Sequence, residues 1–297
     1  MTQKLINLQT TEYEHQFDKA ALNALRALKG VDVITKFVMD WTYIKWHIVE
    51  LAGSNFHVTE ESCPDLYSQV KDVFDTLDII KIPEIYTEWG HFINAYTTGY
   101  KDSTLLVLYS GAVDLMTEDE LRFVVGHEAG HIKSGHVLYH MMAQMFSNII
   151  TNVSIAAPLA QPIYLVALLY WTRMSEFTAD RAGLLACQNV DAALNAVIKM
   201  SGLPSKYFKK MDRESFMQQA KEFQERYGGV TDTVIKNISI LNDSHPWTIM
   251  RAAELIKWIE SGEYEKVLSN TKGKICPVCG KPVSSVCDVC PYCGYKF

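Results

Sequence analysis

The chain of 297 residues lacks an excess of positive charge, because its 28 Lys and Arg residues stand against 34 Asp and Glu, for a net charge of −6. Phosphate binding needs a basic face, so this balance argues against a nucleic-acid partner. Residues 1–17 also lack the apolar stretch of a secretory signal peptide. Cysteine is scarce before the last segment, which holds five of the seven, and this favours a reducing compartment. We therefore expect a cytoplasmic protein.

Charged residues are missing from one long internal stretch. Residues 134–172 contain no Asp, Glu, Lys or Arg, and residues 149–171 within them are long enough to span a bilayer. Asn152, Pro158 and Pro162 interrupt this span, which favours a buried or membrane-touching helical hairpin over a full crossing. Membrane contact through residues 149–171 is therefore an alternative that the sequence leaves open.

The most informative motif is His127-Glu128-Ala129-Gly130-His131. Thr117 and Glu120 form a capping box before it, and apolar residues then recur at three- and four-residue steps, which predicts an amphipathic helix. Histidines four residues apart lie on the same side of a helix, so His127 and His131 can bind one zinc ion. Glu128, beside them, is the expected general base of a peptide-bond hydrolase.

A catalytic zinc site has three protein ligands and keeps one position for water, so a third ligand must come from elsewhere. The best candidate is Glu176, and Asp180, four residues later, could hydrogen-bond the far nitrogen of a ligating histidine. A third histidine six residues after His131 is excluded, because Val137 occupies that position. His136 should turn away from the zinc-facing side of the helix, and we interpret it as structural. An ordinary surface carboxylate pair is the alternative for Glu176 and Asp180.

Together with two further motifs, these residues resemble the HtpX-like and CAAX-prenyl-protease-like gluzincin metallopeptidases. The further motifs are Ser244-His245-Pro246 followed by Arg251, and Asn94-Ala95-Tyr96 upstream. The resemblance covers roughly residues 63–258 and implies a zinc-dependent metalloendopeptidase. It implies that His127, His131 and Glu176 are the zinc ligands and Glu128 the general base.

The same resemblance implies that His245 and Arg251 line the site near the developing oxyanion. From the residues alone, His245 could be a loop residue and Arg251 could pair with a carboxylate such as Glu254. The Asn94-Ala95-Tyr96 segment belongs to two predicted strands, residues 92–99 and 104–109, joined by a polar turn. One strand should form a sheet edge that binds an extended peptide through its main chain, although a plain structural hairpin fits the periodicity as well.

The last segment contains two CPxCG motifs, which typically form a zinc ribbon. Their four thiolates, from Cys276, Cys279, Cys290 and Cys293, leave no open position on the metal, so this zinc should be structural. Cys287 offers a competing pair with Cys290, but the repeated Pro and Gly favour the outer pairs, and we expect Cys287 not to be a ligand.

The sequence thus predicts a mostly helical α+β fold: a zincin-type metallopeptidase domain with a small edge-strand sheet, followed by a small zinc ribbon. We expect an N-terminal helical segment (1–60), the metallopeptidase domain (61–270) and the ribbon (271–297). The predicted function is a zinc metalloendopeptidase that cleaves protein or peptide substrates and contains one catalytic and one structural zinc ion. The alternative is a catalytically idle binding or adaptor protein on a zincin fold.

Overall fold

The computed structural model describes residues 2–27, 41–100, 103–152, 161–226, 248–269, 274–283, 288–290 and 292–297. The helices are η1 (Thr10–Glu12), α1 (Gln16–Ala27), α3 (Trp41–Ser54), α4 (Pro64–Thr76), α5 (Ser110–Leu115), α6 (Glu118–Lys133), α7 (Val137–Asn152), α8 (Gln161–Cys187), α9 (Val190–Met200), η2 (Ser205–Lys210), α10 (Arg213–Arg226), α12 (Thr248–Glu260) and α13 (Glu263–Ser269). The strands are β1 (Phe56–Val58), β2 (Glu84–Glu88), β3 (Ala95–Tyr100), β4 (Ser103–Tyr109), β5 (Lys274–Ile275) and β6 (Pro282–Val283). The mostly helical α+β class is thus confirmed.

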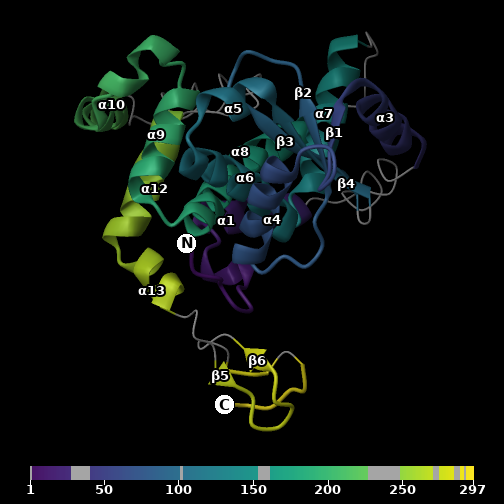
Figure 1. The fold of residues 1–297 in the computed structure, drawn as a ribbon, viewed down its shortest axis with the longest axis vertical. Coiled ribbons are helices and arrows are strands. Elements are labelled where there is room, and N and C mark those ends of the chain that lie inside the picture. The colour runs from purple at the N-terminus through teal and green to yellow at the C-terminus, as the bar shows by residue number, and fades with distance from the viewer. Residues whose placement is uncertain are drawn as a thin grey trace.

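The four-stranded sheet is mixed, with the order β1-β2-β4-β3. Strands β2 and β4 are parallel, whereas β1 pairs with β2, and β3 with β4, in antiparallel fashion. The predicted hairpin corresponds to β3 and β4, and β3 is one of the two edge strands of the sheet. Figure 1 shows the sheet on one side of α6 and α8, with α9 and α12 on the other, and both figures show β5 and β6 apart from the helices.

Helices α6 and α8 lie against each other at the centre of the helical body (Figure 1). Their closest approach depends on residues without large side chains. A Cβ added to Gly126 would lie 2.3 Å from the Cβ of Ala186, and one added to Gly130 would lie 2.6 Å from the Cβ of Ala182. Small residues on both helices thus bring the 127–131 segment of α6 and the Glu176 region of α8 into contact.

Replacing Gly126 with alanine should lower the free energy of unfolding by about 1–3 kcal/mol, because the new methyl group overpacks the contact between α6 and α8. Urea titration followed by circular dichroism would measure the change. Gly53→Ala in α3 is a matched control, since its added Cβ has no neighbour within 4 Å and alanine is the better helix former. If Gly126→Ala had the same free energy of unfolding as the parent, the close contact between α6 and α8 would not contribute to stability.

Helix α6 begins and ends through specific local interactions. Thr117 is the N-cap, and the side chains of Thr117 and Glu120 each accept a hydrogen bond from the other residue's backbone N–H, as the capping box predicts. At the other end the N–H of His136 donates to the carbonyl of His131 and that of Gly135 to Ile132, while Gly135 has a φ of 72°. This is a Schellman motif, and it folds the chain back toward the last turn of α6.

The N-terminal segment packs on the same core as helices α6 and α8. Leu5, Leu8 and Tyr13 belong to the hydrophobic cluster that contains Val125 of α6 and Ala182 of α8. Helix α1 lies alongside α8. The division of the chain at residues 60 and 270 therefore remains a proposal.

Residues 149–171 fall at the end of α7 and the start of α8, and the intervening residues 153–160 lie outside the described part of the chain. Among the helices that are described, none combines the length and apolar character required to cross a membrane.

Candidate functional site

Three side chains from α6 and α8 converge on one point. The Nε2 atoms of His127 and His131 are 3.2 Å apart, and the Glu176 carboxylate lies 3.4 Å from the first and 3.3 Å from the second. All three residues are buried. Ligands held about 2.0–2.1 Å from a tetrahedral zinc ion are about 3.3 Å apart. Glu176 approaches His127 with Oε2 and His131 with Oε1, so the three residues are suited to hold a zinc ion and to leave one position open.

His127 is fixed from behind by a carboxylate and a guanidinium. Its Nδ1 lies 2.9 Å from Asp180 Oδ1, and Arg251 donates to both oxygens of Asp180, at 2.8 and 2.6 Å. Arg251 also lies 3.5 Å from the Glu176 carboxylate. Helix α12 thus contributes a buried cation to the two acidic residues of α8.

His131 is supported by a different and longer set of contacts. Its Nδ1 lies 3.0 Å from Nδ1 of His136, and Nε2 of His136 lies 3.2 Å from Oδ2 of Asp18 in α1. Helical periodicity placed His136 away from the site, but the Schellman turn at Gly135 returns this ring to His131. The glycine is the sequence signal that could have revealed this contact, whereas nothing near Asp18 in the sequence points to it.

Burial and neighbouring charges shift the pKa values of these groups in opposite directions. Burial and the charge of Arg251 lower the pKa of His127, but hydrogen bonds to Asp180 and Glu176 outweigh them and raise it to about 9. Burial lowers the pKa of His131. Burial raises the pKa of Asp180, yet Arg251 brings it below its ordinary value. In the absence of a metal, these shifts favour the charged, doubly protonated form of His127, and metal binding through Nε2 has to release the proton on that atom.

Glu128 is a buried residue that lines a small cavity of about 70 Å³. His127, Arg251, Asn94 and Ala95 line the same cavity. Its remaining walls, which sequence analysis did not identify, are mainly apolar and come from Ile93, Phe123, Val124, Met200 and Thr248. The cavity therefore joins the predicted general base to the predicted substrate edge.

The structure does not bring the other predicted residues into contact with His127, His131 and Glu176 within the part of the chain that it describes. The hydroxyl of Tyr96 donates to Glu88 at 2.8 Å, so this ring is held on the sheet. His245 lies outside the described residues. Glu254, the alternative partner of Arg251, instead contacts His15 and Lys257.

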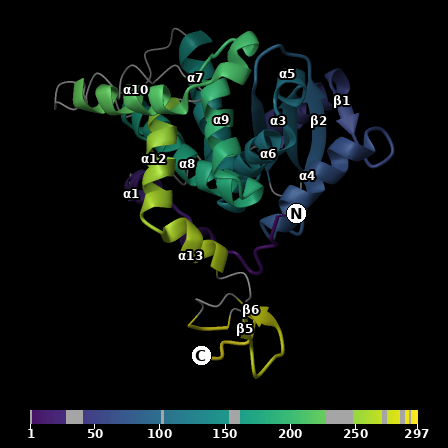
Figure 2. The same cartoon turned by 60° about the vertical axis from the view of Figure 1, so that its left-hand side comes forward.

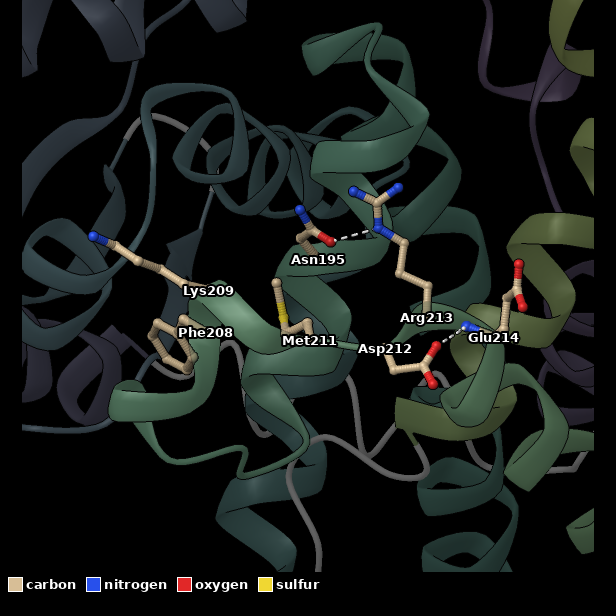
Figure 3. Close-up of a pocket in the computed structure, with 7 residues that line it drawn as sticks. All are labelled: Asn195, Phe208, Lys209, Met211, Asp212, Arg213 and Glu214. Carbon is tan, nitrogen blue, oxygen red and sulfur yellow. Dashed lines mark hydrogen bonds between the residues drawn. The ribbon is translucent and has the colours of Figure 1, made fainter.

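A larger pocket of about 400 Å³ lies away from this cluster, at the surface formed by α9, η2 and α10 (Figure 3). Its polar groups are paired with one another: Arg213 donates to Asn195, and Asp212 accepts from the backbone N–H of Glu214. None of its lining residues belongs to the two possible metal clusters, so it offers no alternative site for the chemistry.

The four C-terminal cysteines form the second possible metal cluster. The sulfur of Cys276 lies 3.6 Å from that of Cys293, and the sulfur of Cys279 lies 3.7 Å from that of Cys290. A disulfide requires about 2.05 Å, whereas four sulfurs about 2.3 Å from a tetrahedral zinc are about 3.8 Å apart. Both knuckles end at a glycine in the left-handed region, Gly280 and Gly294. The cluster is consistent with a zinc ribbon, and Cys287 lies outside the described residues.

The chain is similar in sequence to several known proteins. Plastoglobule-localized metallopeptidase 48, chloroplastic, of Arabidopsis thaliana is 27% identical over 273 residues, which cover 90% of this chain and 78% of that protein. A protease HtpX homolog of Ralstonia pickettii (strain 12J) is 23% identical over 237 residues, covering 70% of this chain and 78% of the relative. The crystal structure of S. mikatae Ste24p matches with a TM-score of 0.36 and 18% identity over 80% of this chain and 62% of that one, a similarity too low to support an argument. The model of peptidase family M48 matches residues 61–259, and the chain therefore belongs to this family.

Proposed function

We propose that the protein is a zinc-dependent metalloendopeptidase in which His127, His131 and Glu176 hold the catalytic zinc and Glu128 is the general base. The observation that supports this most is the convergence of the two Nε2 atoms and the Glu176 carboxylate, whose separations are close to the edge of a tetrahedron around zinc. Membership of family M48 supports the same activity.

The residues of the proposed zinc site have different roles in peptide hydrolysis. Zinc, when bound, supplies a Lewis acid that polarises the scissile carbonyl and lowers the pKa of water. Glu128 accepts the proton of the attacking water and passes it to the leaving amine. Asp180 and Arg251 hold the ring of His127 so that its Nε2 faces the metal. The role of His245 as a donor to the oxyanion remains a prediction.

The edge of β3 is the proposed binding site for the substrate main chain. The Asn94 carbonyl accepts from the N–H of Tyr109 in β4, so even-numbered residues of this edge direct their backbone groups to β4. Ala95 and Thr97 therefore direct theirs outward. At Gly99 the outward N–H donates to the sulfur of Met141 in α7. An extended peptide can thus pair with Ala95 and Thr97, and α7 limits the edge at Gly99.

Specificity beyond the main chain should come from the apolar wall of the cavity. Phe123, Val124 and Met200 leave a volume of only about 70 Å³ beside His127 and Glu128. The side chain that enters this space should therefore be small and apolar. The cysteine cluster holds the second zinc, which closes the ribbon and takes no part in hydrolysis.

Digestion of casein or a peptide library, with and without a zinc chelator, tests this function. We expect cleavage of internal peptide bonds, loss of cleavage with the chelator and recovery on adding zinc, while elemental analysis finds two zinc ions per chain. Cleavage that persists without zinc would contradict the proposal. Two bound zinc ions without cleavage of any peptide would favour the idle binding protein.

A further inference from the structure

A continuous series of hydrogen bonds connects the proposed zinc ligand His131 to Asp18, which lies in α1 and outside residues 61–259 of the family match. Nδ1 of His131 meets Nδ1 of His136 at 3.0 Å, and Nε2 of His136 meets Asp18 Oδ2 at 3.2 Å. All three side chains are at most 4% exposed. Such complete burial means that water does not substitute for these partners.

The remaining partners of Asp18 show that this carboxylate only accepts hydrogen bonds. Trp171 donates to Oδ1 at 2.9 Å, and the Thr178 hydroxyl donates to Oδ2 at 2.6 Å. The Thr178 oxygen in turn accepts from the backbone N–H of His15. Burial raises the pKa of Asp18, but the hydrogen bonds from His136, Thr178 and Trp171 bring it below its ordinary value. Asp18 is therefore a fixed acceptor at the end of the series.

A fixed acceptor determines where each proton lies. When His136 is neutral, its proton must be on Nε2 to reach Asp18, which leaves Nδ1 of His136 as an acceptor. The proton of His131 must then be on Nδ1, and its Nε2 presents a lone pair toward His127 and Glu176. This is the tautomer that a zinc ligand needs. His127 obtains the same arrangement directly from Asp180.

We propose that Asp18 is a positioning residue that acts through His136 to hold His131 in its zinc-binding tautomer, so that helix α1 sets the zinc affinity of the site. This inference rests on the proposed role of His131 as a ligand. It gives the N-terminal segment a part in the metal centre, in addition to its packing against α8. The reason is chemical: Asp18 supplies the charge that orients both rings.

The test is the zinc affinity of Asp18→Asn, measured near neutral pH by competition with a chromophoric chelator. The amide can donate to Nε2 of His136 and reverse both tautomers, so we expect the affinity of the histidine site to fall by about 10- to 100-fold. The cysteine site of the same molecule should keep its affinity. Trp171→Phe is the matched control, because it removes one hydrogen bond to Asp18 and leaves the carboxylate and His136 in place.

A purely structural Asp18 gives a different pattern. Asp18→Asn and Trp171→Phe would then lower the unfolding temperature while both kept the parental zinc affinity, and this result would overturn the proposal. If Asp18→Asn does not fold, His136→Gln interrupts the same series and should lower the affinity by a similar factor. The zinc affinity is measured independently of peptide cleavage. A parent that binds two zinc ions but cleaves no peptide would therefore contradict the proposed function and leave the proposed role of Asp18 intact. A parent without zinc at His131 contradicts both.

Discussion

Glu128→Gln is expected to retain both zinc ions and to lose peptide cleavage by about 10²- to 10⁴-fold, because the amide cannot accept the proton of the attacking water. Glu128 is buried in the small cavity beside His127, where few other groups could replace it. The decrease should appear in kcat, since glutamine keeps the size of the side chain and leaves the β3 edge unchanged. Initial rates on one defined peptide, with zinc content measured on the same preparation, would quantify it.

Glu118→Gln is the matched control, because it removes the same charge from an exposed position in the first turn of α6. Its cleavage rate should equal that of the parent. Parental activity of Glu128→Gln with full zinc occupancy would remove Glu128 from the mechanism. A loss of activity together with a loss of zinc would instead indicate that Glu128 helps to hold the site.

The features predicted from the sequence are those encoded within a few consecutive residues. The capping box at Thr117 and Glu120, the helix that contains residues 127–131 and the glycine turns of the cysteine knuckles are each encoded locally, and the structure forms all of them. The β3–β4 hairpin is local in the same sense. Short-range patterns of this kind do not depend on how distant helices pack.

The approach of Glu176 to the histidines depends on packing between distant segments. Gly126 and Gly130 allow α6 to contact α8 at Ala182 and Ala186, and these small residues are a signal that could have predicted the contact. His136 was misplaced because a helical wheel does not apply after Gly135. Asp18 and Arg251 come from distant segments, and their partners could not be read from spacing.

Arg251→Met should lower the free energy of unfolding of the metal-free protein by about 3–5 kcal/mol, because it removes the guanidinium from the buried carboxylates of Asp180 and Glu176. Methionine keeps most of the volume, so the lost charge is the main change. Lys257→Met in the same helix α12 is the control. The Lys257 side chain is 57% exposed and its ion pair with Glu254 lies at the surface, so this variant should change the free energy by less than about 1 kcal/mol.

The pH dependence of the Arg251→Met defect separates charge from packing. In the parent, burial raises the pKa of Asp180, but the opposing effect of Arg251 brings it below its ordinary value. The ionised Asp180 therefore stabilises the fold at pH values above its unfolded pKa, and this stabilisation is lost as the pH falls. Without Arg251, burial dominates and the pKa of Asp180 should rise. Acidification then protonates Asp180 in the variant and removes the destabilising buried charge, whereas the parent gains no such stability. Urea unfolding of both chelator-treated proteins should therefore show a difference that narrows as the pH is lowered from 7 toward the ordinary carboxyl range. A difference that stayed constant would show that Arg251 stabilises the protein through packing, and its role in balancing Asp180 and Glu176 would be wrong.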